Sequence, residues 1–268
     1  MKIEMKKTMM GVILCVYVLA VLISIAPAPV YAGNDDGENP PEVGVEWIND
    51  YPGTEDDLYY MDDSAGGLYN KLGDTGWNKR FNYGDSLAWE EDFKDVSNGG
   101  TDNIYIDDVD IAMFAGHSTV KDGYVALYFT TLHDDYYLEW FDPEWGDRDL
   151  EWIGLHSCQV LRDADLSYWA CSLNGLHLLC GFKSYAFDTS TPMGKKWADR
   201  MVDDGWWDVA YTVKQSWWYA ADVSQPSGTV VRVMGETIEC GDDYIWGQGT
   251  ICSDPPVDGT KYYWTHTV

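Results

Sequence analysis

Basic side chains are scarce in this sequence of 268 residues, which contains 17 lysines and arginines against 45 aspartates and glutamates. The net charge of −28 repels the phosphate backbones of DNA and RNA, so the composition excludes nucleic acid as a partner. A surface this acidic suits a saline exterior, where dense counterions screen the repulsion between carboxylates. A cell-surface protein from an ordinary habitat is the alternative.

Long apolar runs are also rare, and the one that stands out covers residues 11–25. Three lysines precede it within the first seven residues, and the small-residue sequence Val30-Tyr31-Ala32 follows it. This layout is typical of a secretory signal peptide cleaved after Ala32, and a retained N-terminal anchor is the alternative. The run is short for a bilayer span. We therefore expect residues 1–32 to be removed and the mature protein, with no membrane span, to be secreted or held at the cell surface.

Cysteine is infrequent, and five cysteines remain after export. In an oxidising exterior an odd count leaves one thiol without a disulfide partner. The Gly-rich stretch between Cys240 and Cys252 predicts a hairpin closed by a disulfide, and Cys171 can pair with Cys180. These pairings leave Cys158 free, although four cysteines allow three connectivities.

Hydrophobic periodicity predicts one domain over residues 43–268, after a polar, Pro-rich and flexible lead-in at 33–42. Strands are expected at 43–48, 77–83, 109–115, 150–156, 175–182 and 228–235, with a hairpin strand at 124–132 and an acidic, aromatic loop at 133–149. Helices are expected at 55–76, 84–95, 160–173, 191–205 and 208–223. The alternation of strands and helices predicts an α/β three-layer sandwich with a mainly parallel sheet of six strands, extended by a small β-rich tail at 236–268.

Two reactive side chains follow core strands of this predicted sheet. His117 comes two residues after the apolar strand 109–115, and Cys158 comes two residues after the strand 150–156. Functional residues of an open parallel sheet collect at the carboxyl ends of its strands. If these strands are neighbours, an imidazole and a thiol open onto one edge, which is the combination needed for nucleophilic catalysis by a thiolate.

An export signal, an α/β sheet, and the stretches VDIAMFAGHS, IGLHSCQV and LHLLCGF resemble the caspase–gingipain–legumain superfamily of cysteine peptidases. More narrowly they look like uncharacterised secreted caspase-like domains of archaea and bacteria, over roughly residues 43–235. The resemblance implies a caspase-like sheet, a peptide or protein substrate, no cofactor, His117 as general acid/base and Cys158 as nucleophile. It also implies oxyanion donors among the backbone N–H groups of Gly116 and Ser118. Ser118 departs from the pattern, because these peptidases usually have glycine there.

Metal binding has two candidate residue sets. A zinc site would use His156, Cys158, His177 and Cys180. In a strand, however, His177 and Cys180 point to opposite faces, so we expect structural histidines and no metal at this place. The second set consists of acids in the loop 133–149, which could bind calcium: Asp134, Asp135, Asp142, Asp147 and Asp149. Their spacing fits no EF-hand pattern, and the alternative is that they are solvated surface acids.

A second function class is a catalytically inactive scaffold that binds a glycan or a protein. Its aromatic platform would be formed by Trp140, Trp145, Trp217 and Trp218, although most tryptophans in such a sheet pack between its layers. An exposed aromatic patch with a buried or oxidised Cys158 would favour the binding module. An accessible thiol beside His117 would favour the enzyme.

Overall fold

The computed structural model describes residues 39–53, 56–133, 135–203, 209–256 and 259–268. The expected signal peptide and most of the expected lead-in lie outside these ranges. Within them, no helix combines the length and apolar character needed to cross a bilayer.

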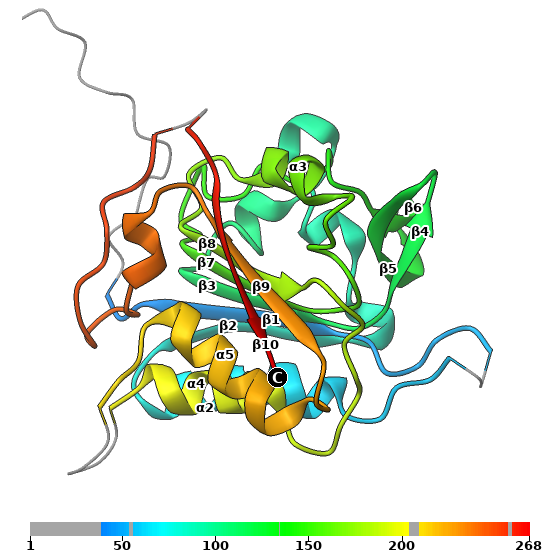
Figure 1. The fold of residues 1–268 in the computed structure, drawn as a ribbon. Helices are drawn as coiled ribbons and strands as arrows, with labels where there is room; N and C mark the ends of the chain where they lie inside the picture. Colours follow the sequence, from blue (N-terminus) through cyan, green and yellow to red (C-terminus); the bar gives the residue numbers. More distant parts are fainter. Residues whose placement is uncertain (1–38, 54–55, 134, 204–208, 257–258) are drawn as a thin grey trace, which may run out of the picture. The chain divides into compact units, whose positions relative to one another are not determined.

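A seven-stranded sheet in the order β10-β9-β8-β7-β3-β1-β2 forms the centre of the fold (Figure 1). From β2 to β8 all neighbours are parallel, whereas β9 and β10 are antiparallel to theirs. The predicted α/β fold with a mainly parallel sheet is therefore confirmed, with one strand more than expected. The extra strand is β10, from the tail. The strands are β1 Glu42–Trp47, β2 Asn78–Gly84, β3 Ile111–Ala115, β7 Trp152–His156, β8 Leu178–Phe182, β9 Val230–Gly235 and β10 Tyr262–Thr267.

The sheet is buried on both faces, and β3 shows this most clearly. Its residues Ile111, Met113 and Ala115 belong to one apolar core, whereas Ala112 and Phe114 belong to the other. Successive side chains of a strand point to opposite faces, so a central parallel strand is apolar throughout. The continuous apolar run in the sequence has this cause.

Three helices cover one face: α2 (Met61–Asp74), α4 (Met193–Met201) and α5 (Val213–Ser224) (Figure 1). A capping box of Thr212 and Gln215 starts α5. The indoles of Trp197 and Trp217 meet edge to face, with ring centroids 5.0 Å apart. They lie over Gly154 of β7, where a Cβ atom would come within 2.6 Å of Trp197. Glycine thus lets both indoles pack directly on the sheet.

The other face carries 3-10 turns and one short helix. The helix expected at 84–95 was wrong, and the helix expected at 160–173 forms only over residues 166–172, as a short α-helix followed by a 3-10 turn. Asp85 uses its carboxylate to accept hydrogen bonds from the backbone N–H groups of Asn49 and Asp50, at 2.8 and 2.9 Å, instead of capping a helix. The elements are η1 Asp85–Leu87, η2 Glu90–Asp92, η3 Val96–Asn98, η4 Asp102–Ile104, α3 Leu166–Trp169 and η5 Ala170–Ser172; η6 Glu239–Asp242 lies in the tail.

A small antiparallel sheet, β4 (Ser118–Lys121), β5 (Tyr124–His133) and β6 (Asp135–Leu138), follows β3. Positive φ angles at Asp122 and Gly123, 51° and 96°, make the tight turn between β4 and β5. The predicted strand at 124–132 is confirmed. The predicted loop at 133–149 is wrong at its start, because β6 occupies residues 135–138.

Candidate functional site

The turns that carry His117 and Cys158 leave adjacent parallel strands at the same edge of the sheet. β3 pairs with β7, and Ala115 lies opposite His156 in the register. The predicted neighbourhood of these two strands is therefore correct. Because parallel strands end on the same side, both turns open at the carboxyl edge.

The two turns contact each other directly. The N–H of Gly116 donates to the carbonyl of His156 at 3.2 Å, and the hydroxyl of Ser118 donates to the carbonyl of Cys158. Ser118 thus links the loop of the candidate base to that of the candidate nucleophile. The same geometry corrects one prediction, because the Gly116 amide is occupied by the His156 carbonyl and is not a free oxyanion donor.

A buried tyrosine that the sequence did not single out fixes the backbone of His117. The hydroxyl of Tyr51 accepts from the His117 N–H at 2.6 Å and donates to the Tyr128 carbonyl at 3.2 Å. Its ring lies 4.5 Å from the imidazole, centroid to centroid, and burial raises the pKa of its hydroxyl. A Cβ atom at Gly116 would approach that hydroxyl to 2.6 Å, so only glycine fits. Tyr51 lies 66 positions from His117, and no motif pointed to it.

Nε2 of the His117 imidazole lies 2.8 Å from the carbonyl of Asp56. A carbonyl only accepts, so Nε2 carries the proton in this arrangement. Nδ1 is then the ring nitrogen with a lone pair, which is the atom that can accept a proton from a nucleophile.

The thiol of Cys158 is half-buried and points elsewhere. Its Sγ donates to the carbonyl of Ala186 at 3.4 Å, and burial raises the pKa of the thiol. Among the described residues no hydrogen bond or ion pair connects this thiol to His117. The site therefore holds a protonated thiol, and the catalytic pairing of the two residues stays a prediction.

Exposed aromatic side chains adjoin Ala186, whose carbonyl accepts from the Cys158 thiol. Tyr185 and Phe187, on either side of Ala186, expose 62% and 46% of their surface. Tyr59 exposes 73%, and its N–H donates to the carboxylate of Asp188. Exposed aromatic rings of this kind offer faces that a substrate side chain can contact.

His156 is buried on the helix side of β7. Its Nδ1 lies 3.0 Å from the hydroxyl of Ser64 and its Nε2 lies 3.3 Å from the carbonyl of Phe187. Burial lowers its pKa to about 4, so it is neutral at physiological pH. Its role is structural.

The expected aromatic platform is wrong. Trp145 and Trp217 are fully buried, in the cores on opposite faces of the sheet. Trp140 packs against Tyr168 instead, and Trp218 stacks on His266.

The loop acids considered for calcium are engaged separately. Asp135 pairs with Lys121 at 3.1 Å, and Asp142 pairs with Lys94 at 3.7 Å. Asp149 is buried, and Asp134 lies outside the described residues. Within the described ranges these acids form no group that could hold a metal ion, so the structure gives the calcium interpretation no support.

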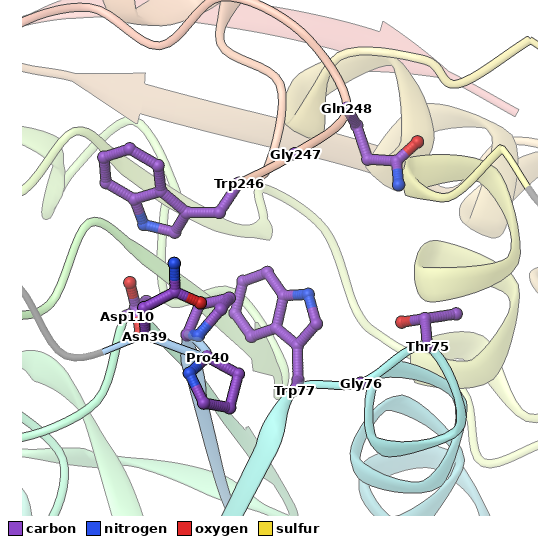
Figure 2. Close-up of a pocket in the computed structure, with 10 residues that line it drawn as sticks. Asn39, Pro40, Thr75, Gly76, Trp77, Asp110, Trp246, Gly247 and Gln248 are labelled. Atoms are coloured by element: carbon purple, nitrogen blue, oxygen red, sulfur yellow. The ribbon is translucent and has the colours of Figure 1, made fainter.

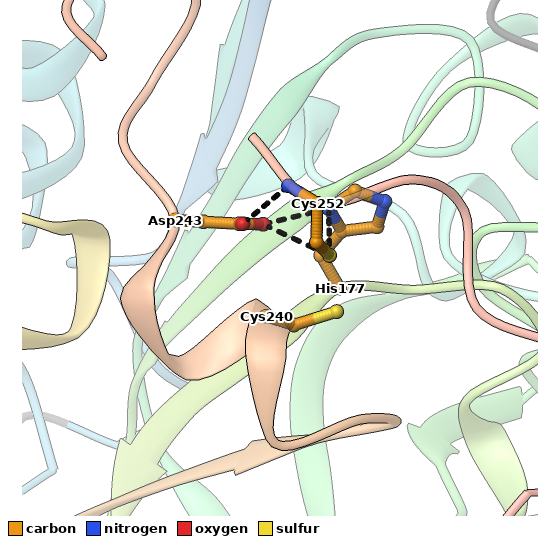
Figure 3. Close-up of side chains that lie close together, drawn as sticks. All are labelled: His177, Cys240, Asp243 and Cys252. Atoms are coloured by element: carbon orange, nitrogen blue, oxygen red, sulfur yellow. Dashed lines mark hydrogen bonds and ion pairs between the residues drawn. The ribbon is translucent and has the colours of Figure 1, made fainter. Parts of the chain in front are cut away.

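All five cysteines of the described chain are free thiols. Cys171 is exposed in η5 whereas Cys180 is fully buried in β8, so the predicted bond between them is wrong. Cys240 and Cys252 do approach each other, but as two members of a group with His177 and Asp243 (Figure 3). Cys240 lies in a 3-10 turn, η6, rather than in a hairpin strand, and both cysteines are free thiols in this structure.

A surface pocket of about 510 Å³ lies at the opposite, amino edge of the sheet (Figure 2). Trp77 and Trp246 face into it, beside Asp110 at the start of β3. It contains neither His117 nor Cys158, so it is separate from the candidate site.

Residues 45–268 match the family described as "Domain of unknown function (DUF6345)". Since this match covers most of the sequence, the chain belongs to the DUF6345 family. No curated protein matches the chain.

Proposed function

We propose that this member of the DUF6345 family is a secreted cysteine hydrolase with a caspase-like sheet, and that it acts as a peptidase through Cys158 and His117. One observation carries the proposal: the Ser118 hydroxyl contacts the Cys158 carbonyl, between turns that leave adjacent parallel strands. The motifs around both residues resemble those of caspase-like peptidases, and the layout of residues 1–32 supports export.

The chemistry needs one local change in the site. The Cys158 side chain rotates from the Ala186 carbonyl toward the imidazole, where His117 Nδ1 takes the proton from Sγ. The thiolate then attacks the substrate carbonyl carbon, and the imidazolium protonates the leaving amine. Water hydrolyses the resulting thioester and restores the thiol. The Ser118 N–H is the remaining proposed donor to the oxyanion.

The favoured substrate residue before the scissile bond is lysine or arginine. The negative field of the protein attracts cationic peptides, mainly through the association rate. The exposed rings of Tyr185 and Phe187 add faces on which an aliphatic stem or a cation can pack.

A fluorogenic panel with Arg, Lys, Asn or Asp before the scissile bond tests this proposal at low and high salt. We expect cleavage after Arg and Lys, and a loss of at least a hundredfold in Cys158→Ala and His117→Ala. Cys171→Ala is the matched control, because its thiol is exposed and lies apart from the site. Faster cleavage after Asp would contradict the charge argument but not the peptidase itself. No cleavage by the wild-type protein, or activity retained in Cys158→Ala, would contradict the peptidase.

The second candidate is a non-catalytic module that binds a glycan or a protein. The observation that favours it is the protonated Cys158 thiol, turned toward the carbonyl of Ala186. An inactive wild-type protein that binds a glycan or peptide array, with binding lost in Tyr185→Ala, would support it.

A further inference from the structure

Four potential metal ligands converge at the amino end of β8, at the opposite end of the strand from the Cys158 edge (Figure 3). His177 directly precedes β8, Cys240 and Asp243 come from η6 and the residue after it, and Cys252 comes from the C-terminal segment. Their ligand atoms all lie within 4.8 Å of one another. His177, Cys240 and Asp243 are buried, and Cys252 is half-buried.

The spacing of these atoms fits a tetrahedral ion. Zinc bonds of about 2.3 Å to sulfur and about 2.1 Å to nitrogen or oxygen place a sulfur about 3.6 Å from either of those atoms. Cys252 Sγ lies 3.5 Å from His177 Nδ1 and 3.6 Å from Asp243 Oδ2. His177 Nδ1 and Asp243 Oδ2 are closer, at 2.7 Å, because a hydrogen bond joins them. Around a bound ion this hydrogen bond would be replaced by two bonds to the metal, and the distance between the two atoms would increase to about 3.4 Å.

We propose that His177, Cys240, Asp243 and Cys252 form a tetrahedral zinc site. Two thiolates with an imidazole and a carboxylate suit Zn²⁺, whereas Ca²⁺ and Mg²⁺ require oxygen ligands. Four protein ligands fill the coordination sphere, so the site is structural rather than catalytic.

The surrounding groups orient these ligands as metal sites require. Asp243 Oδ1 accepts from the Cys252 N–H at 2.7 Å, and Oδ2 accepts a long hydrogen bond from the Trp152 indole at 3.4 Å, which leaves a lone pair of Oδ2 for the ion. His177 Nε2 makes no hydrogen bond among the described residues but lies 3.6 Å from the carboxylate of Asp254. A proton on Nε2 facing that carboxylate leaves the lone pair of Nδ1 directed at the ion.

The ion would fasten the C-terminal segment to the sheet. Cys252 precedes β10, the edge strand that pairs with β9, whereas His177 adjoins the central part of the same sheet. A surface pocket of about 480 Å³, lined by Cys252, Asp254 and Pro255, lies beside the group and gives an ion an entry path.

The test measures the metal content of the mature protein, purified without chelator, stripped under reducing conditions, and reloaded with Zn²⁺ or Co²⁺. We expect one bound zinc per chain, a cobalt spectrum with tetrahedral and thiolate bands, and a melting temperature that rises with zinc and falls again with chelator. Asp243→Asn and Cys252→Ser should lose stoichiometric binding, and the control Cys171→Ser should keep it. The wild-type readouts need no variant, and none of them depends on peptidase activity.

The competing structure is a disulfide between Cys240 and Cys252. Two missing thiols in the denatured protein, with peptide mapping to this pair and no zinc taken up after reduction, would overturn the proposal. Zinc binding that survives both Asp243→Asn and Cys252→Ser would also overturn it, because the ion would then be held elsewhere.

Discussion

Removal of the Tyr51 hydroxyl should destabilise the edge that carries His117. In Tyr51→Phe the N–H of His117 and the carbonyl of Tyr128 lose their partner in a partly buried environment. Leaving buried polar groups without a hydrogen bond costs about 1–3 kcal/mol. We expect a loss of this size in the free energy of unfolding.

Gly116→Ala should be destabilising for a reason that involves the same hydroxyl. The new Cβ would lie 2.6 Å from the Tyr51 oxygen and 2.9 Å from the ring of Phe114. Overpacking of this kind costs about 1–3 kcal/mol. In the double variant the clash with the hydroxyl is gone and only that with Phe114 remains. The loss should therefore fall short of the sum of the single losses by about 1 kcal/mol, as expected for residues in contact.

Urea unfolding of the two single variants, the double variant and wild type measures this coupling, provided that the slopes agree. Tyr59→Phe is the matched control, because that side chain is 73% exposed and should change stability by less than about 0.5 kcal/mol. If the loss in the double variant equals the sum of the two single losses to within about 0.5 kcal/mol, the reasoning is refuted, since Tyr51 and Gly116 would then not share the contact.

Two further predictions concern protonation. Burial, with Asp95 and Asp147 nearby, raises the pKa of Asp102 to about 8, from an ordinary value of 3.8. A raised folded pKa stabilises the protein below pH 4, and this contribution is lost as the pH rises through 8. As the pH is raised from 5 to 8.5, the urea midpoint should therefore decrease, which corresponds to a loss of unfolding free energy on the order of a few kcal/mol. In Asp102→Asn this dependence on pH should be weaker; a variant with the same dependence as wild type would contradict the prediction. In a timed alkylation the exposed thiol of Cys171 should react before that of Cys158, whose pKa is raised by burial, and the fully buried Cys180 should react only after unfolding; mapping that finds Cys158 modified first would show an activated thiol.

Local patterns in the sequence were sufficient to predict the central part of the sheet. The apolar runs of β3 and of β7 up to His156 indicated strands covered on both faces, and their spacing from His117 and Cys158 placed both residues at one edge. These inferences hold because the strand period and the direction of a parallel sheet are properties of the chain itself.

Tertiary contacts decided the turns on the second face. Residues 84–95 begin with a residue that can cap a helix, but the carboxylate of Asp85 accepts hydrogen bonds from the backbone N–H groups of Asn49 and Asp50, about 36 positions away. In the segment 160–173, Asp165 accepts from the N–H of Val125, in β5, and pairs with Arg162. Long-range hydrogen bonds of this kind override a local propensity of a few tenths of a kcal/mol per residue.

The proposed metal ligands show most clearly the difference between what local sequence patterns predict and what tertiary contacts decide. Strand alternation was the wrong reason to separate His177 from Cys180, because His177 precedes β8 and packs against Trp152, in the same core as Cys180. The partners of His177 are Asp243 and Cys252, which lie 66 and 75 positions along the chain. No spacing rule reaches so far, because the approach depends on β9 returning antiparallel beside β8 and on η6 folding over its end. The sequence by itself determined which residues could carry chemistry. Only the folded sheet decided which of them meet, because the connections between strands set the distances between their ends.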